Sequence, residues 1–386
     1  LPLVQQAKLL AKQYDAVIAN PPYMGGKGMN TALKDFAKKK FPDSKSDLFS
    51  MFMERNLKLT NESGHLGFMT PFTWMFLSSY EKLRKLLLEK HTLNSLVKPS
   101  YTAFFDSAIV AICAFVVSKT HLGDWKGSFF DLEYLGNADE QSPRFLKLLK
   151  DKSYFLCKNN DFNKIRGSPV AYWVSEKVRE VFETSPSLGN NSASSNGIQT
   201  GNNAVFVRLW QEVDFKSKGF KWFPYNKGGE YRKWYGNNYY FVDWAMDGYR
   251  IKKQDNSCIR GSEFYFHEGV TWSDITSSKS SFKYFQKGYL FDAKGPSAFF
   301  TLDNLHYALG FLNSELVYIF SKLLNPTLSF QIGDFKNLPF KIHSKKRVNE
   351  IVKKCILIAK TDWDSYEISW DFTQNPVIRM GQPNLE

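Results

Sequence analysis

The sequence predicts an α/β protein in which the second half of a doubly wound, Rossmann-like sheet is followed by a mixed, β-rich domain. Three observations support this prediction. Apolar runs of strand length alternate with helical patterns over residues 14–118, as in the parallel sheets of α/β proteins. Two prolines end the first of these runs. Beyond residue 197, short strand patterns rich in aromatic residues replace the alternation.

The first strand pattern, residues 14–19, follows the end of a helix and stops at Asn20-Pro-Pro-Tyr23. Proline fixes φ and has no N–H to donate, so Pro21 and Pro22 together must end the strand in a rigid corner. Ligands of open α/β sheets bind beyond the carboxyl ends of the strands. We therefore expect Asn20 and Tyr23 to line a site.

This corner suits methylation of a planar exocyclic amine such as N6 of adenine. The lone pair of that nitrogen is delocalised into the ring, so the nitrogen is a poor nucleophile. The Asn20 side-chain oxygen and the Pro21 carbonyl could each accept one hydrogen bond from N6, which favours a pyramidal nitrogen. Tyr23 offers a face on which an unstacked base could lie. Positioning of the base and stabilisation of the developing charge would then supply most of the rate enhancement. The alternative is a plain proline turn.

The next elements continue the alternation. A glycine-rich stretch, residues 25–28, follows the corner and suits a lip over the site better than a phosphate cradle. A basic loop follows, which either contacts DNA phosphates or is simply solvated; it contains Lys38, Lys39, Lys40 and Lys45. The later patterns predict helices over residues 46–59 and 78–90, and strands over residues 65–70, 93–97 and 108–118.

A change of composition near residue 190 divides the chain. Residues 121–189 carry helical patterns joined by polar connections, so we interpret them as a helical bridge. Ser185–Gly197 is poor in large residues, so we interpret it as a linker or exposed turn and as the best boundary. The predicted divisions are the sheet domain (1–120), the bridge (121–189), the β-rich domain (190–340), and a C-terminal helix and tail (341–386).

The β-rich domain contains a concentrated aromatic segment, residues 220–244, in which eleven of 25 residues are aromatic. Core packing accounts for more than half of these rings in our interpretation. The interleaved cations still favour a surface that meets phosphates and unstacked bases; they are Lys221, Lys227, Arg232 and Lys233. A turn followed by a strand is expected within residues 197–207, short strands over residues 269–272 and 288–292, and helices over residues 305–324 and 346–360.

Composition points to an anionic partner. A net charge of +13 with 16% aromatic residues favours nucleic acid, with a membrane surface as the competing partner. No apolar run reaches the roughly 18 residues of a membrane span, and no signal peptide is evident. The four cysteines form no Cys-x-x-Cys pair, so we expect neither a metal site nor disulfides, and a cytoplasmic location. The chain begins at Leu1, which fits a piece of a longer protein.

Together these motifs resemble the γ-type DNA N6-adenine methyltransferases that carry a target-recognition domain. The resemblance covers most of the chain, and its carriers are Asn20–Tyr23, Ser46–Phe49, Gly64–Trp74, Leu83-Arg84, Phe104-Phe105 with Ile109–Phe115, Thr200–Val207, Leu312–Ser314 and Leu338–Phe340. A narrower similarity is to the methyltransferases of bacteriophage-exclusion (BREX) systems. Its carriers are Lys221–Gly236, Phe291-Asp292 and Lys294-Gly295.

The resemblance implies roles for individual residues. The motif Asn20-Pro-Pro-Tyr23 would be catalytic, with Tyr23 stacked on a flipped adenine. Phe115 matches the position of a second stacking ring, and Phe104 or Phe105 are weaker matches; Phe115 is almost equally well explained as a core residue. The family's methyl donor is S-adenosylmethionine, but the glycine-rich half that holds most of it is lacking here. Asn20 would only border the cofactor, and this chain alone is expected to be inactive.

The resemblance also implies double-stranded DNA as the partner, with other defence-system proteins as further partners. Within methyl transfer, the same corner occurs in enzymes that methylate a glutamine amide in release factors or a guanine amine in ribosomal RNA. Those compact enzymes have little use for residues 197–340, which favours DNA. The chain could instead be a non-catalytic DNA-recognition module. A nuclease is disfavoured because Asp214-Phe-Lys216 and Asp334-Phe-Lys336 lack a partner carboxylate upstream.

Overall fold

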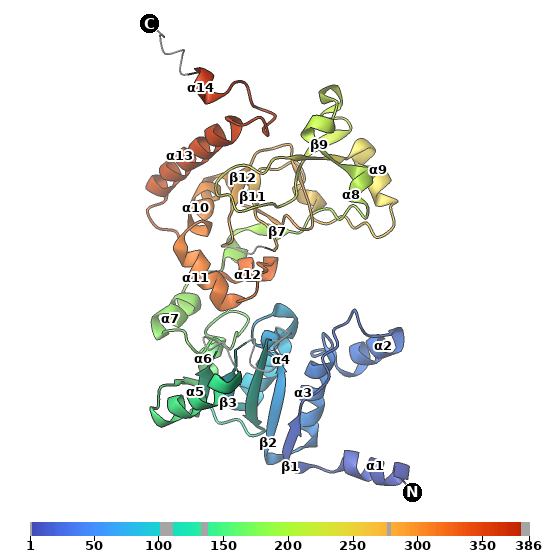
Figure 1. Cartoon of the computed structure of the whole chain (residues 1–386), viewed down its shortest axis with the longest axis vertical. Helices are drawn as coiled ribbons and strands as arrows, with labels where there is room; N and C mark the ends of the chain where they lie inside the picture. The colour runs from blue at the N-terminus through green and yellow to red at the C-terminus, as the bar shows by residue number, and fades with distance from the viewer. Residues whose placement is uncertain (1, 101–110, 133–137, 276–278, 380–386) are drawn as a thin grey trace. The chain divides into compact units, whose positions relative to one another are not determined.

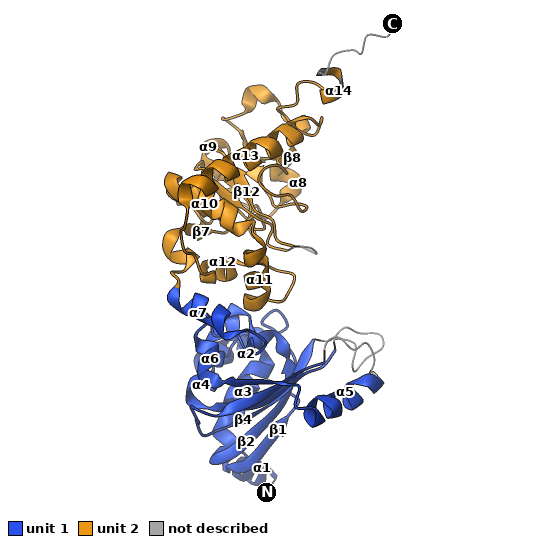
Figure 2. Cartoon of the chain, turned by 90° about the vertical axis from the view of Figure 1, so that its left-hand side faces the viewer, with its two compact units in different colours: residues 1–184 blue, residues 185–386 orange. Residues whose placement is uncertain are grey.

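The computed structural model describes residues 2–100, 111–132, 138–275 and 279–379. The chain forms two compact units (Figure 2): unit 1 comprises residues 1–184 and unit 2 comprises residues 185–386. The predicted α/β class is confirmed, since helices and strands alternate in unit 1 and short strands prevail in the first part of unit 2.

Unit 1 is built around a single sheet (Figure 1). Its strands are β1 (Tyr14–Ala19), β2 (Thr60–Pro71), β3 (Thr92–Lys98), β4 (Ile112–Ser118), β5 (Lys126–Asp131) and β6 (Phe155–Lys158). Its helices are α1 (Pro2–Ala11), α2 (Thr31–Lys40), α3 (Leu48–Leu59), the 3₁₀ turns η1 (Phe72–Met75) and η2 (Ser78–Tyr80), α4 (Glu81–Lys90), α5 (Ala138–Lys150), α6 (Asn159–Asn163) and α7 (Glu176–Thr184).

The sheet is mixed, with the strand order β1-β2-β4-β3-β5-β6. β1 and β2 are parallel, as are β3 and β5, whereas β4 runs antiparallel to both β2 and β3. β1 is an edge strand of the sheet. Its Ile18 side chain is 84% exposed, and α1 buries none of its residues. This edge of the sheet is therefore open, while the core lies around β2, β3 and β4.

The expected alternation of strands and helices is present from β1 to β4, but two expectations were wrong. The lysines expected in a basic loop, residues 38–40, form the last turn of α2, whose first turn is capped by Asn30: its Oδ1 accepts from the Leu33 amide at 2.9 Å. Residues 121–184 are not a separate bridge, because β5 and β6 extend the sheet of unit 1. The apolar patterns of β5 and β6 are short and lie between polar connections, so periodicity did not identify them as strands.

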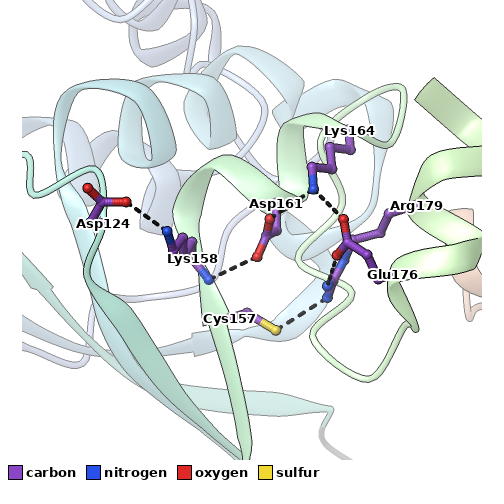
Figure 3. Close-up of polar contacts among 7 residues, drawn as sticks. All are labelled: Asp124, Cys157, Lys158, Asp161, Lys164, Glu176 and Arg179. Carbon is purple, nitrogen blue, oxygen red and sulfur yellow. Dashed lines mark hydrogen bonds and ion pairs between the residues drawn. The ribbon is translucent and has the colours of Figure 1, made fainter. Parts of the chain in front are cut away.

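A chain of charged groups fastens α7 to the β6 edge of unit 1 (Figure 3). The Arg179 guanidinium, only 6% exposed, donates to Cys157 Sγ at 3.3 Å. Glu176 accepts from Lys164 at 2.5 Å and lies 3.5 Å from Arg179. Because the buried arginine needs these partners, α7 is tied to unit 1 rather than free to act as a linker.

The described residues of unit 2 form two small sheets, with the strand orders β13-β9-β10-β8 and β12-β11-β14-β7. Its strands are β7 (Ala193–Ser195), β8 (Val207–Leu209), β9 (Trp222–Asn226), β10 (Tyr240–Asp243), β11 (Gly269–Thr271), β12 (Lys283–Phe285), β13 (Leu290–Phe291) and β14 (Ser297–Phe299). Its helices are η3 (Leu188–Asn191), α8 (Asn203–Phe206), η4 (Trp210–Glu212), η5 (Phe215–Ser217), α9 (Ala245–Lys252), η6 (Ser262–Phe264), α10 (Leu302–Leu312), α11 (Glu315–Leu324), α12 (Ile332–Asn337), α13 (Lys345–Asp364) and α14 (Pro376–Arg379).

Three features of unit 2 differ from expectation. Residues 185–197 are not a linker, since they form η3 and β7 and bury Leu188 completely. Residues 203–206 form a helical turn, and the strand follows only at Val207. The expected helix over 305–324 is broken after Leu312, because the Asn313 side chain exchanges two hydrogen bonds with the backbone of Phe282, at 2.9 and 3.1 Å. Periodicity alone does not reveal such a break.

Candidate active site at the end of strand β1

The Asn20-Pro-Pro-Tyr23 corner lies directly after the last residue of β1. Pro21 is buried, whereas Asn20, Pro22 and Tyr23 are exposed. The Tyr23 hydroxyl donates to Asn20 Oδ1 at 3.3 Å and reaches the Met69 carbonyl of β2 at 3.5 Å. Strand β1 thus delivers an amide and a phenol ring together to one accessible place at the end of the sheet.

The backbone after the corner is held by α3. Asp47 is the N-cap of that helix, and its Oδ1 accepts from the Met24 amide at 2.9 Å and from the Phe49 amide at 3.3 Å. The Leu48 amide in turn donates to the Met24 carbonyl at 3.0 Å. The helix expected from residue 46 therefore begins at Leu48, after its Asp47 N-cap. One carboxylate caps α3 and fixes the corner, so the two are positioned as one piece.

The Tyr23 ring is 42% exposed and meets the Phe49 ring edge-on, with centroids 6.2 Å apart. Partial burial, followed by proximity to Cys113, raises the pKa of the Tyr23 phenol. Burial raises the pKa of the Cys113 thiol itself to about 12. Both groups are therefore neutral near pH 7, and Tyr23 acts as a hydrogen-bond donor with a free ring face.

The structure does not support the stacking role expected for Phe115. This residue lies on β4 with 3% of its surface exposed. Its ring stacks on Phe68 at 5.9 Å and lies 4.8 Å from Trp74. An alternating apolar strand that is covered by helices buries such a ring, so Phe115 is a core residue here. Phe104 and Phe105 lie outside the described residues.

The lysines expected to contact DNA in unit 1 are all exposed. Lys38, Lys39 and Lys40 end α2, and Lys45 lies in the turn before α3. Lys38 is paired loosely with Asp35 at 3.9 Å. Three cations in the last turn of α2 also favour the helix through its dipole, so their presence has a local structural reason.

The cations expected to contact DNA in unit 2 are largely engaged within the fold. The Arg232 guanidinium lies 3.2 Å from Asp362 and 5.0 Å from the Trp363 ring. Lys233 Nζ donates to the Asn313 carbonyl at 2.8 Å. Lys227 lies over Tyr240, and Lys221, the one exposed member, over Trp222. Arg232 and Lys233 thus fasten the aromatic segment to its neighbours, whereas Lys227 and Lys221 contact rings of the segment itself.

The chain is similar to known methylases and methyltransferases. Residues 4–105 match the family "Eco57I restriction-modification methylase". The chain is 41% identical to the adenine-specific methyltransferase BrxX of Escherichia coli O9:H4 (strain HS), over 98% of this chain and 32% of that protein. It is 37% identical to the adenine-specific methyltransferase PglX of Lacticaseibacillus casei (strain Zhang), over 97% of this chain and 33% of that protein.

These relatives confirm the resemblance to adenine methyltransferases of the PglX type that the motifs indicated. The chain spans about a third of the length of each. Two solved structures share its fold at 12% identity. The Type IIL restriction-modification enzyme MmeI in complex with DNA has a TM-score of 0.58 over 92% of this chain and 50% of that one. A DrdV–DNA complex has a TM-score of 0.55 over 92% of this chain and 45% of that one.

In the part of the chain that the structure describes, every helix is too short or too polar to cross a membrane.

Proposed function

We propose that the protein containing this chain is a site-specific DNA adenine N6-methyltransferase of a phage-defence or restriction-modification system. Unit 1 would supply the substrate-amine side of the active site, and unit 2 would recognise the DNA target. The observation that carries this proposal is the exposed Asn20 amide beside the exposed Tyr23 ring at the carboxyl end of β1. The similarity to adenine-specific methyltransferases over nearly the whole chain supports it.

Each group at the corner has a distinct part in this proposal. The Asn20 Oδ1 and the Pro21 carbonyl would accept the two N6 hydrogens of an adenine turned out of its duplex. Loss of conjugation leaves the N6 lone pair available for attack on the methyl group. The Tyr23 ring would hold the base by stacking, and its hydroxyl keeps the Asn20 amide oriented through their 3.3 Å hydrogen bond.

S-adenosylmethionine would supply the methyl group when bound. Such cofactors need a glycine-rich turn between a strand and a helix and an acidic residue for the ribose, and the described residues around β1 offer no such turn. They would provide only the Asn20 wall of that site. The open edge of β1 and the exposed Ile18 support the proposal that further strands of the full-length protein continue the sheet there and hold the cofactor.

A methyl-transfer assay with the full-length protein tests the proposal. Labelled S-adenosylmethionine is offered with DNA, ribosomal RNA or release factor in separate reactions. Asn20→Ala is compared with Asn163→Ala, which removes an equally exposed amide of α6. We expect label at adenine N6 of DNA, a fall of roughly 100-fold or more in Asn20→Ala, as for loss of a group that stabilises the transition state, and full activity in Asn163→Ala.

The other outcomes separate the alternatives. Label in RNA or in release factor would contradict the DNA assignment and make unit 2 a docking surface for those substrates. If no substrate is labelled but DNA is still retained on a filter, the protein is a DNA-recognition module without catalysis. Equal activity in Asn20→Ala and Asn163→Ala would remove the corner from the mechanism.

A further inference from the structure

A polar hollow of about 390 Å³ lies within unit 2, and no residue of the aromatic segment is among those that line it. It is formed by five separate stretches of chain that come together around the start of α12. Its polar side chains are Asn196, Gln199, Arg260, Asp274, Lys294 and Gln331. Of these side chains the sequence motifs marked only Lys294, because the set is spread over more than 130 positions of the sequence.

The walls of this hollow are fixed by main-chain hydrogen bonds. Gln199 and Cys258 exchange two such bonds of 2.8 Å, which join the first wall to the Arg260 loop. The Arg260 carbonyl also accepts from the buried Tyr265 hydroxyl at 2.9 Å. After Arg260 the chain turns through the left-handed Gly261, where an added Cβ would lie 2.6 Å from Ser195 Oγ. These contacts therefore fix the backbone position of Arg260.

The opposite walls are joined in the same way. The Asp274 amide donates to the Lys294 carbonyl at 3.1 Å, and the Phe330 amide donates to the Asp274 carbonyl at 2.9 Å. The backbone of Gln331 is held by its main-chain amide, which donates to the carboxylate of buried Asp334 at 2.9 Å. Such a frame spares the cost of ordering the backbone on binding, which favours affinity.

The side chains of the hollow offer both hydrogen-bond donors and acceptors. Lys294 and Asp274 form an ion pair of 2.8 Å at the wall, where Asp274 is 17% and Lys294 is 65% exposed. The Arg260 side chain is exposed and forms no ion pair among the described residues. The amide side chain of Gln331 is also exposed. A free guanidinium, an amide and a carboxylate thus share one concave surface.

This mixture distinguishes the hollow from a phosphate site. A phosphate accepts hydrogen bonds only, so a site for it is lined by donors and cations. The edges of base pairs in the major groove instead present donors and acceptors together. Arginine pairs with guanine, glutamine or asparagine with adenine, and a carboxylate with cytosine. All three kinds of side chain are present here, and the cations at residues 232 and 233 are already engaged elsewhere.

We propose that this hollow reads the edges of base pairs in duplex DNA, with Arg260 and Gln331 as specificity-determining residues. The inference rests on the proposed function and adds to it the residues that select the target. Arg260 contacts a guanine through its two terminal nitrogens, and Gln331 contacts an adenine through its amide. Asp274 and Lys294 form the wall between them.

The test is a binding selection with the full-length protein and a pool of random-sequence DNA duplexes. Wild type is compared with Arg260→Ala, Gln331→Ala and Arg347→Ala. The last is the matched control, because Arg347 is an exposed arginine of α13 and does not line the hollow. We expect one enriched motif for wild type and for Arg347→Ala. Arg260→Ala should lose roughly tenfold to hundredfold preference at one base position, and Gln331→Ala at another.

Two results would overturn the inference: an unchanged motif in both hollow variants, or no motif at all in wild type. Arg260→Lys retains the charge but loses the two-pronged contact, so it should also lose preference at that position. Thermal unfolding shows whether Arg260→Ala folds. If it does not fold, Arg260→Lys replaces it in the test beside Gln331→Ala. Adenine methylation, mapped in DNA from cells that express the same variants, distinguishes failure of this inference (methylation present at an unchanged motif) from failure of the proposed function (no methylation).

Discussion

The corner at residues 20–23 and the aromatic segment at residues 220–244 both combine rings with polar groups, but they use them in opposite ways. At the corner, the backbone is fixed by two prolines and Asp47, and the Asn20 and Tyr23 side chains remain exposed. In the aromatic segment, four rings are buried and Arg232 and Lys233 are bonded within unit 2.

The difference shows what makes a side chain available for function. Where main-chain groups and prolines hold the structure, side chains need not contribute to it. Where rings and cations hold the structure themselves, a ligand could reach them only by breaking contacts. Residue type therefore does not distinguish a binding surface from a core, whereas the source of the stabilising contacts does. The following predictions test this comparison.

The largest expected effect is that of Phe115→Ala. Because this ring is buried between Phe68 and Trp74, its loss should lower the free energy of unfolding by about 3–5 kcal/mol. Chemical denaturation followed by tryptophan fluorescence measures this change. Unchanged stability with lost methylation would instead make Phe115 a ring of the site, and the contrast with Tyr23 would disappear.

The next effect concerns Lys283 of β12, whose Nζ is buried without a hydrogen-bond partner among the described residues. Burial, with a smaller contribution from Arg232, lowers the pKa of Lys283 to about 8. The unfolded chain binds this proton more tightly, so the free energy of unfolding rises with pH from about 8 to the ordinary lysine pKa near 10.5.

Lys283→Met should therefore stabilise the protein at pH 7, by about 3 kcal/mol at most. The gain should shrink as the pH rises above 8 and disappear above about 10.5. Denaturation of the variant and its parent across this pH range measures the difference. Lys287→Met, at an exposed position of the same region, is the control. A gain that does not vary with pH would exclude the buried charge as its cause.

A smaller effect is expected for Tyr23→Ala, which tests whether the ring is available for a base. The ring is 42% exposed, so the free energy of unfolding should change little. Loss of base stacking, about 1–3 kcal/mol, should lower methylation by the full-length protein roughly tenfold to hundredfold. Tyr366→Ala removes another exposed ring, 53% exposed, from unit 2 and should have neither effect. A large loss of stability in Tyr23→Ala would make the corner resemble the aromatic segment.

The smallest effects should separate two lysines of the aromatic segment. Lys233→Ala removes a hydrogen bond to the Asn313 carbonyl and should cost about 1–2 kcal/mol of stability, with the salt dependence of DNA binding unchanged. Lys221→Ala, at an exposed position, should reduce the slope of log affinity against log salt by about 1 and leave stability unchanged. Filter binding at several salt concentrations, with denaturation in parallel, measures both. The reverse result would show that engaged cations still contact phosphate.

Sequence reasoning was most successful where local rules decide the structure. The proline stop predicted that β1 ends just before Asn20, and apolar periodicity located α3, α4 and the strands up to β4. The sequence also indicated that most rings of residues 220–244 belong to a core. For Phe115 it indicated two roles, a stacking ring or a core residue. These are consequences of spacing and residue type within a few positions.

Features set by distant partners could not be predicted in this way. The break at Asn313 depends on the backbone of Phe282, and the engagement of Arg232 depends on Asp362, 130 residues away. The hollow around Arg260 requires five segments to converge. In each case the sequence shows a residue capable of a role, but only the tertiary structure decides which partner it meets.

The main-chain frame around the hollow has a consequence for evolution. Because the loops are joined through amides and carbonyls, replacing a wall side chain such as that of Arg260 or Gln331 breaks none of these bonds. Exposed positions of this kind tolerate most substitutions within about 0.5 kcal/mol. The lineage can therefore vary these positions one mutation at a time, without passing through unfolded intermediates, while the scaffold that displays them stays the same.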